Sequence, residues 1–272
     1  MTASVVDLPD LHSQEPSVLL PVESVGHVGV KRLISLTRPN RPAMVVMDIA
    51  VGLRAEQRGA HMSRLIECTS TPGEPDDLRH YTKMIFDGLR VLVPDAASWQ
   101  VSARAVQTVP VAGGGLKPIE EICEWRAEDG AEPTVTWGAA FKVCLACPQA
   151  QAAIAHDQND LENLGAHPSH NQLCDLEIVL SGDAEVAAAT SADTLLAAGE
   201  EATSGPVREL FKRRGEADTV AAVHRDARFA EDALRDLAAK LRAGNPDATQ
   251  VRVEIVNYES IFEYPLRCTV VA

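Results

Sequence analysis

The chain has 272 residues, with 25 Lys and Arg against 39 Asp and Glu, which gives a formal net charge of -14. A chain this acidic is not attracted to nucleic acid or anionic membranes in general, so we expect neither as a partner, and any phosphate site must be local. No apolar run approaches the roughly 20 residues of a membrane-spanning helix, and the first residues lack the pattern of a signal peptide. These features predict a cytoplasmic protein.

The six cysteines are too sparse for a disulfide scaffold in a chain of this length. In a reducing compartment they remain thiols, and some are available to bind a metal. The composition is 46% hydrophobic but only 4% aromatic, which predicts a core built mainly from Val, Leu, Ile and Ala.

In chain order, residues 1–21 are polar, contain two prolines and lack a sustained period, so we expect an N-terminal arm. Runs rich in Val, Ile and Leu predict two long strands joined by a hairpin at residues 39–42. Apolar spacings of three and four then predict two helices, and alternation predicts two more strands. The predicted strands are 22–38, 43–54, 99–109 and 119–126, and the helices are 61–68 and 75–93.

The second half repeats this order of elements more loosely, without countable sequence similarity to the first. Its predicted strands are 134–143, 173–180, 250–257 and 264–271, and its predicted helices are 190–200 and 228–243. We therefore expect an α+β chain with two modules, residues 22–130 and 131–272.

Residues with metal-binding potential cluster in the middle of the chain. They are Cys144, Cys147, His156, His167 and His170. Thiolate and imidazole suit zinc or ferrous iron, and the absence of a second Cys pair favours an open, catalytic site over a closed structural one. Two alternatives stay open for the Cys-x-x-Cys pair: a redox pair, or two half-buried thiols at the end of a strand.

Several separated stretches resemble the GTP cyclohydrolase type IB family, and its archaeal branch from methanopterin synthesis in particular. The most specific is Arg58-Gly59-Ala60-His61-Met62-Ser63-Arg64, which is similar to the family's Lys-Gly-x-His-Met-Ser-Arg. The other similar stretches are residues 8–10, 25–30, 147–151, 170–172, 212–216, 227–232 and 257–261. The resemblance implies the bimodular tunnelling fold, in which each module has the order strand, strand, helix, helix, strand, strand.

The resemblance also implies a divalent metal, Fe²⁺, Zn²⁺ or Mn²⁺, held by Cys147, His170 and Glu216. Three protein ligands leave a fourth position for water. In the family, activated water attacks C8 of the guanine ring of GTP, formate leaves, and rearrangement yields a dihydropterin. We therefore expect a GTP cyclohydrolase that makes a dihydroneopterin phosphate.

Further roles follow from the resemblance. Glu259 would anchor the purine by accepting hydrogen bonds from its ring nitrogens. His61 is a candidate for proton transfer or a phosphate role, with Cys147 and Gln149 as further catalytic candidates. Candidate triphosphate ligands are Arg58, Arg64 and Lys212. The alternative for these three cations is ordinary solvated charge, and the alternative for Glu259 is a carboxylate at a strand edge that is exposed to water. Family sites lie at subunit interfaces, so a homotetramer or similar assembly is implied.

Three positions depart from the family pattern. Gln149 replaces a second Cys, Leu173 replaces an Arg, and Phe262 replaces the His that is the family's proton shuttle. A benzyl group cannot transfer protons, so His61, His156 or His167 would have to substitute. Cys144 could stand in for the missing thiol.

These departures keep two other functions open. One is a diverged relative that acts on another heterocycle or stops at ring opening, and the other is a non-catalytic binding protein. The glycine run at 113–115 lacks the Lys-Ser/Thr that would follow in a phosphate-binding loop, so we expect a hairpin there.

Overall fold

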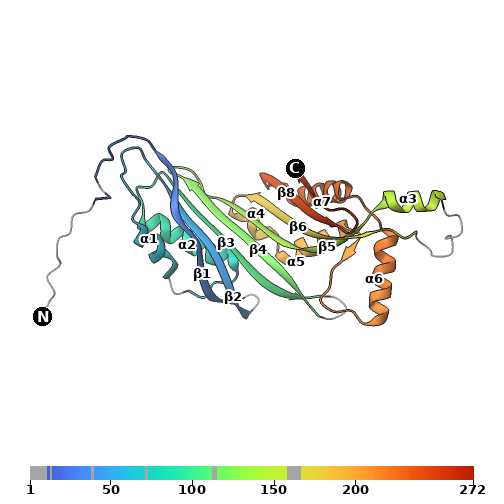
Figure 1. The fold of residues 1–272 in the computed structure, drawn as a ribbon. Helices are drawn as coiled ribbons and strands as arrows, with labels where there is room; N and C mark the ends of the chain where they lie inside the picture. The colour runs from blue at the N-terminus through green and yellow to red at the C-terminus, as the bar shows by residue number, and fades with distance from the viewer. Residues whose placement is uncertain (1–10, 13, 38–39, 71–72, 112–114, 158–166) are drawn as a thin grey trace. The chain divides into compact units, whose positions relative to one another are not determined.

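The computed structural model describes residues 11–12, 14–37, 40–70, 73–111, 115–157 and 167–272 (Figure 1). The strands are β1 (Val22–Thr37), β2 (Asn40–Leu53), β3 (Ser98–Pro110), β4 (Leu116–Glu128), β5 (Thr134–Ala146), β6 (Asn171–Gly182), β7 (Gly205–Pro206), β8 (Gln250–Glu259) and β9 (Leu266–Val271). The helices are α1 (Met62–Glu67), the 3-10 helix η1 (Cys68–Ser70), α2 (Leu78–Leu92), α3 (Pro148–Asp157), α4 (Ala184–Ala189), α5 (Ala192–Ala202), α6 (Arg213–Arg225) and α7 (Ala230–Gly244). None of the described helices is long and apolar enough to cross a membrane.

The chain divides into two compact units. Unit 1 comprises Met1–Arg104 and Cys123–Thr134, and unit 2 comprises Ala105–Ile122 and Val135–Ala272, so β3 and β4 contribute to both. The division into modules at residues 22–130 and 131–272 remains a prediction.

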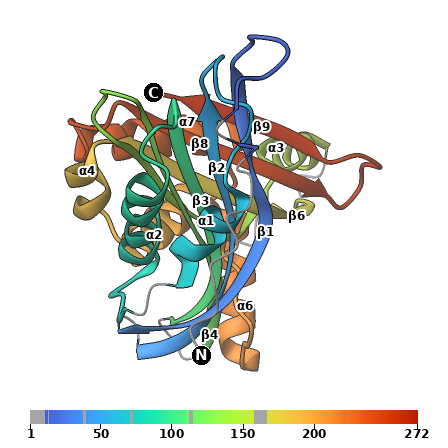
Figure 2. The ribbon, with the colours of Figure 1, turned by 90° about the vertical axis from the view of Figure 1, so that its left-hand side faces the viewer.

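Unit 1 is built on a long antiparallel pair. β1 and β2 pair from Val22 opposite Leu53 to Thr37 opposite Asn40, and β3 and β4 follow in the strand order. Helix α2 begins at Asp77, whose side chain accepts a hydrogen bond from the backbone of His80. Its buried residues recur at helical spacing, so one face packs into the core beside these strands (Figure 2).

Unit 2 has the strand order β3-β4-β5-β6-β8-β9, with β7 paired to β5. Every second residue of β5 is buried, as expected for a strand with one face in the core. That face packs against α5, where a Cβ on Gly199 would lie 2.7 Å from both Leu176 and Phe141. The small residue therefore allows the helix to approach the sheet closely.

The antiparallel register of unit 2 brings three strand ends together. Ala146 at the end of β5 pairs with Asn171 at the start of β6, and Gln172 pairs with Glu259 at the end of β8. The residues that flank these pairs must consequently emerge at one edge of the sheet.

The predicted strands and helices are confirmed, with ends that differ by a few residues. The sequence analysis missed α3, α4, α6 and the short strand β7. Helix α6 is polar on nearly every side and buries only Val223 among its thirteen residues, so it lacks the apolar periodicity on which such a prediction rests. Residues 1–10, 39 and 113–114, which carry parts of the predicted arm, hairpin and glycine loop, lie outside the described residues.

A buried ion triad joins β4 to α5 in unit 2. The ammonium of Lys117, whose side chain is 3% exposed, donates to Glu200 Oε1 at 2.6 Å and to the carbonyl of Lys142 at 2.7 Å. Arg208 donates to both oxygens of the same carboxylate. Burial alone would raise the pKa of Glu200, but the hydrogen bonds from Arg208 and Lys117 outweigh it and lower the pKa.

We expect Glu200→Gln to lower the free energy of unfolding by about 3–5 kcal/mol at pH 7, because it leaves buried Lys117 and half-buried Arg208 without their carboxylate. The lowered pKa of Glu200 means that its contribution is present above the ordinary value of 4.5 and is lost as the pH falls through the folded value. The difference between variant and wild type should therefore shrink below pH 4.5 in urea unfolding curves.

The matched control is Glu201→Gln, which removes an exposed ion pair with Lys240 and should change stability little. Equal losses in the two variants, or a Glu200→Gln deficit that does not depend on pH, would contradict the assignment.

Candidate active site

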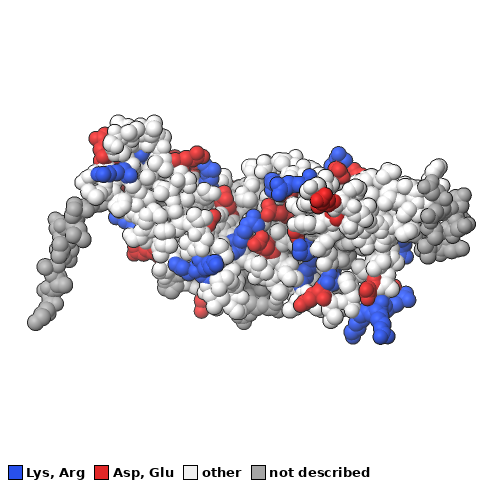
Figure 3. All heavy atoms as spheres, viewed as in Figure 1, with Lys and Arg blue, Asp and Glu red and all other residues white. Residues whose placement is uncertain are grey.

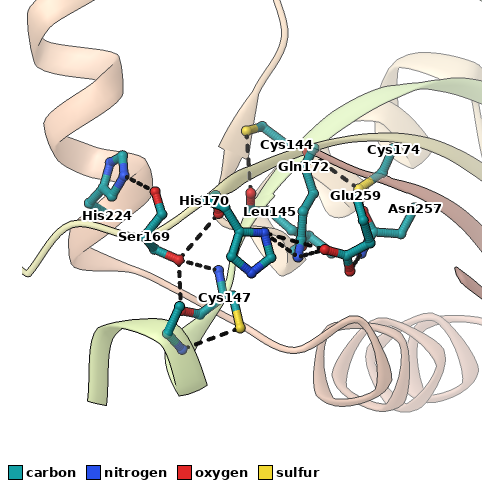
Figure 4. Close-up of polar contacts among 11 residues, drawn as sticks. Cys144, Leu145, Cys147, Ser169, His170, Gln172, Cys174, His224, Asn257 and Glu259 are labelled. Carbon is teal, nitrogen blue, oxygen red and sulfur yellow. Dashed lines mark hydrogen bonds and ion pairs between the residues drawn. The ribbon is translucent and has the colours of Figure 1, made fainter. Parts of the chain in front are cut away.

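The convergence of strand ends in unit 2 creates the candidate site. Cys147 follows β5 directly, His170 directly precedes β6, and Glu259 ends β8. Figure 4 shows the three side chains gathered at this edge, with the imidazole of His170 between the thiol of Cys147 and the carboxylate of Glu259. Residues distant in sequence thus come together because of the register.

A chain of hydrogen bonds fixes Glu259. Its Oε2 accepts from the amide of Gln172 at 2.7 Å, and its Oε1 accepts from the amide of Asn257 at 2.9 Å. Nδ1 of His170 lies 3.3 Å from Oε2, and the side chains of His170 and Glu259 are 9% and 13% exposed. Nδ1 thus faces the carboxylate, which leaves Nε2 as the imidazole nitrogen available to a ligand.

Cys147 is held at the start of α3. Its Sγ accepts a hydrogen bond from the backbone N–H of Ala150 at 3.4 Å. The backbone N–H of Cys147 donates to the hydroxyl of Ser169 at 2.9 Å, and that hydroxyl lies 2.8 Å from the carbonyl of Cys147 and 3.2 Å from the carbonyl of His170. Ser169 therefore couples the backbones of the two candidate ligands.

The residues present fit a divalent metal in part. Thiolate and imidazole are suitable donors, and a carboxylate behind the His ligand is the usual outer-shell arrangement. Glu216, the third predicted ligand, is exposed in the first turn of α6. Among the described residues, no three His, Cys, Asp or Glu side chains form a group able to hold a metal. The structure therefore brings Cys147 and His170 together without Glu216.

The predicted residues of unit 1 lie in and near α1. His61 precedes this helix, and its ring centroid is 4.9 Å from that of His12. Arg58 donates to the side chain of Gln14, and Arg64 lies 3.5 Å from the carbonyl of Leu92. All three are placed within unit 1, and their proposed contacts with a nucleotide stay predictions.

Lys212 and Gln149, also predicted, are exposed in unit 2. Lys212 directly precedes α6 and lies beside exposed Arg213 and Arg214, and Figure 3 shows basic side chains gathered at this end of the helix. Any role of these cations in binding phosphate stays a prediction.

The amino-acid sequence is similar to known proteins over most of its length. The model of the family "Type I GTP cyclohydrolase folE2" matches residues 8–266. The chain belongs to this family. It is 28% identical over 262 residues to "GTP cyclohydrolase FolE2" of Ralstonia nicotianae, which covers 94% of this chain and 91% of the relative. It is 25% identical over 303 residues to "GTP cyclohydrolase MptA" of Methanococcoides burtonii, and this match covers 97% of this chain and 94% of the relative.

Solved structures with little sequence similarity show the same fold as this folE2 family member. The uricase of Arthrobacter globiformis superimposes with a TM-score of 0.55 at 9% identity, covering 94% of this chain and 95% of the uricase. A urate oxidase from Bacillus sp. TB-90 superimposes with a TM-score of 0.54 at 9% identity, covering 92% and 99%. The predicted tunnelling fold is confirmed.

Two departures from the family pattern lie at the site of this folE2 family member. The ring of Phe262, 64% exposed, lies edge-on to the imidazole of His170 with 6.2 Å between centroids. Leu173 is 44% exposed on β6, opposite Cys144 of β5. Figure 4 shows the thiol of Cys144 well apart from that of Cys147, so the predicted replacement of a missing second thiol by Cys144 gains no support.

The structure adds site residues to which the sequence analysis gave no role: Gln151, Ser169, Gln172, His224 and Asn257. Gln172 and Asn257 lie within motifs that resemble the family, and Asn257 precedes Glu259 by two residues on β8, a spacing that puts both on one face and was a usable signal. His224 carried no such signal, because it reaches the site from a polar helix with no apolar pattern.

The thiols should differ in reactivity. Burial raises the pKa of Cys68 to about 12 and also raises the pKa of Cys174. We expect iodoacetamide at pH 8 to label these two residues at least about 100-fold more slowly than the half-buried Cys147, because the thiolate is the reactive form. Peptide mapping by mass spectrometry against time measures this, and comparable labelling of Cys174 and Cys147 would contradict it.

Substitution of Gln172, whose amide donates to Glu259, tests whether the carboxylate of Glu259 is charged. We expect Gln172→Glu to lower the free energy of unfolding by about 2–4 kcal/mol at pH 7, because it places two carboxylates in hydrogen-bonding distance. The uncharged control Gln172→Met should cost less, about 1–2 kcal/mol. Chemical denaturation measures both, and equal costs would argue against a charged Glu259.

Proposed function

We propose that this folE2 family member is a metal-dependent GTP cyclohydrolase, which opens the guanine imidazole ring of GTP and releases formate and a dihydroneopterin phosphate. Family membership over residues 8–266 supports the reaction class. The observation that carries the proposal is the meeting of Cys147, His170 and Glu259 at one sheet edge, since it joins metal donors to a candidate purine anchor.

Cys147, His170 and Glu216 would hold the metal, with Fe²⁺, Zn²⁺ or Mn²⁺ as candidates. A bound divalent ion would supply Lewis acidity and lower the pKa of water at the site. Because Glu216 is exposed on α6, its approach to the other two ligands would accompany metal binding.

The chain's own groups orient the reactants. Glu259 is fixed by the amides of Gln172 and Asn257, and its Oε1, which accepts only from Asn257, retains a lone pair that can accept from a purine N–H. The same carboxylate directs the imidazole of His170. One side chain would thus align both the base and a metal ligand.

Proton transfer must use a group other than Phe262. His167 is the candidate within unit 2, because its Nδ1 is buried and has no hydrogen-bond partner among the described residues. His61 is the candidate in unit 1. Imidazole is the side chain that most often transfers protons in general acid–base catalysis.

We also propose a homotetramer or similar assembly with interfacial sites, and a cytoplasmic location. The exposed apolar side chains of Ile261, Phe262 and Tyr264 beside Glu259 support a surface that a second copy covers. In such an assembly Arg58, Arg64 and Lys212 could reach the triphosphate.

Anaerobic incubation with GTP and each metal in turn tests the reaction. We expect metal-dependent release of formate and appearance of pterin fluorescence, both abolished in Cys147→Ala. Cys144→Ala is the matched control, since it removes a neighbouring thiol that is directed elsewhere, and it should retain activity.

Two results would count against the proposal. A metal-loaded protein that leaves GTP unchanged would overturn it. Accumulation of a formylated, ring-opened nucleotide without formate would instead indicate a relative that stops at ring opening.

A further inference from the structure

The core face of the β6–β8 pair changes from apolar to polar next to the candidate site. The apolar pairs of the core give way to Cys174 opposite Asn257, and then to Gln172 opposite Glu259 at the end of the pairing. Cys174 is 0% exposed and Asn257 is 2% exposed. A buried thiol and a buried amide thus lie between the core and the site, and the reaction proposed above makes no use of the thiol.

The amide of Asn257 has a defined orientation. Its Nδ2 donates to Oε1 of Glu259 at 2.9 Å, and its Oδ1 lies 3.3 Å from the sulfur of Cys174. A carboxylate only accepts, so the amide nitrogen must face Glu259, and the amide oxygen consequently faces the thiol (Figure 4). The reverse orientation would place two acceptors together at Glu259 and two donors together at Cys174.

The thiol of Cys174 is suited to hold this orientation because it can donate. Its sulfur lies 3.5 Å from the carbonyl oxygen of Gln172 as well as 3.3 Å from Oδ1 of Asn257, and both oxygens are acceptors. A thiol can donate a hydrogen bond, whereas a thiolate cannot. Burial raises the pKa of Cys174, so the thiol keeps its proton at neutral pH.

The lone pair that Glu259 offers to a ligand depends on the amide of Asn257. Oε2 of Glu259 accepts from Gln172 and faces His170, so Oε1 is the oxygen with a lone pair to offer. The direction of that lone pair is fixed while the nitrogen of Asn257 donates to Oε1. An S–H donor is weak, but in a buried network a mismatched donor or acceptor is costly, so a weak bond can select one of two amide orientations.

We propose that Cys174 is a positioning residue for Glu259: its thiol donates to Asn257 and thereby directs the amide nitrogen to Oε1, so that the remaining lone pair of Oε1 points at the purine. The inference rests on the purine-anchoring role of Glu259 in the proposed function. It adds that affinity for the purine depends on a buried thiol that does not itself bind the purine.

Steady-state kinetics with GTP and the metal that supports turnover test the inference. Cys174→Ala removes the donor, and we expect it to raise KM at least about threefold with kcat within about twofold, because an anchor holds substrate and transition state alike. Cys174→Ser keeps a hydroxyl donor, so its KM should stay within about twofold of wild type.

Val143→Ala is the matched control. Val143 is fully buried on β5 directly opposite Cys174, so this substitution opens a cavity in the same place but removes no hydrogen-bonding side chain. We expect it to lower the thermal midpoint and to leave KM for GTP unchanged.

A double-mutant cycle followed by urea unfolding gives a readout that needs no GTP. Cys174→Ala should lower the urea midpoint of the wild-type protein, and it should lower that of Glu259→Gln at most about half as much. A glutamine at position 259 can donate or accept, so either orientation of the Asn257 amide is then satisfied and the thiol no longer selects one.

The outcomes separate this inference from the proposed function. An unchanged KM in Cys174→Ala, or an equal rise in Val143→Ala, overturns the positioning role while the cyclohydrolase proposal stands. Wild-type protein that leaves GTP unchanged overturns the cyclohydrolase proposal. The cycle then still decides the positioning role, because equal losses of midpoint in the two backgrounds would contradict it.

Discussion

The pairing of β6 with β5 on one side and β8 on the other determines the site. Side chains in a strand alternate between two faces, so a slip of one residue between β6 and β8 would turn Gln172 and Glu259 to opposite faces. A slip between β5 and β6 would likewise change the pairing of Ala146 with Asn171, which lies next to Cys147 and His170. The buried, aliphatic faces of these strands make such a slip costly. Core packing in unit 2 therefore specifies the chemistry at its edge.

The site itself is a polar network with limited exposure. Both oxygens of Glu259 have partners, because Oε2 accepts from Gln172 and faces Nδ1 of His170, and Oε1 accepts from Asn257, which offsets the loss of water around a side chain that is 13% exposed. Such a network fixes the orientation of the imidazole of His170, a proposed metal ligand. Glu216, by contrast, is exposed on a helix that buries only Val223, and it is not part of this network.

Much of this arrangement was accessible from the sequence. The strands of unit 2 alternate clearly, and the motifs around Cys147, His170 and Glu259 identified side chains that the fold brings together. Helices α3 and α6 were not predicted, because neither has the apolar stripe on which such a prediction depends. The hydrogen bonds of Gln151 and Ser169 go to backbone carbonyls and N–H groups, and these contacts leave no trace in residue type or spacing.

The separation of the site residues along the chain has a consequence for folding. Gln172 and Glu259 are 87 residues apart, and the ion pair of Lys117 and Glu200 joins residues 83 apart. Closing such loops loses chain entropy before any contact compensates for it, so these contacts form late and slowly. A nascent chain consequently exposes the thiol of Cys147 and the imidazole of His170 before the carboxylate of β8 has been synthesised. The completed site is thus a marker of a fully folded unit 2.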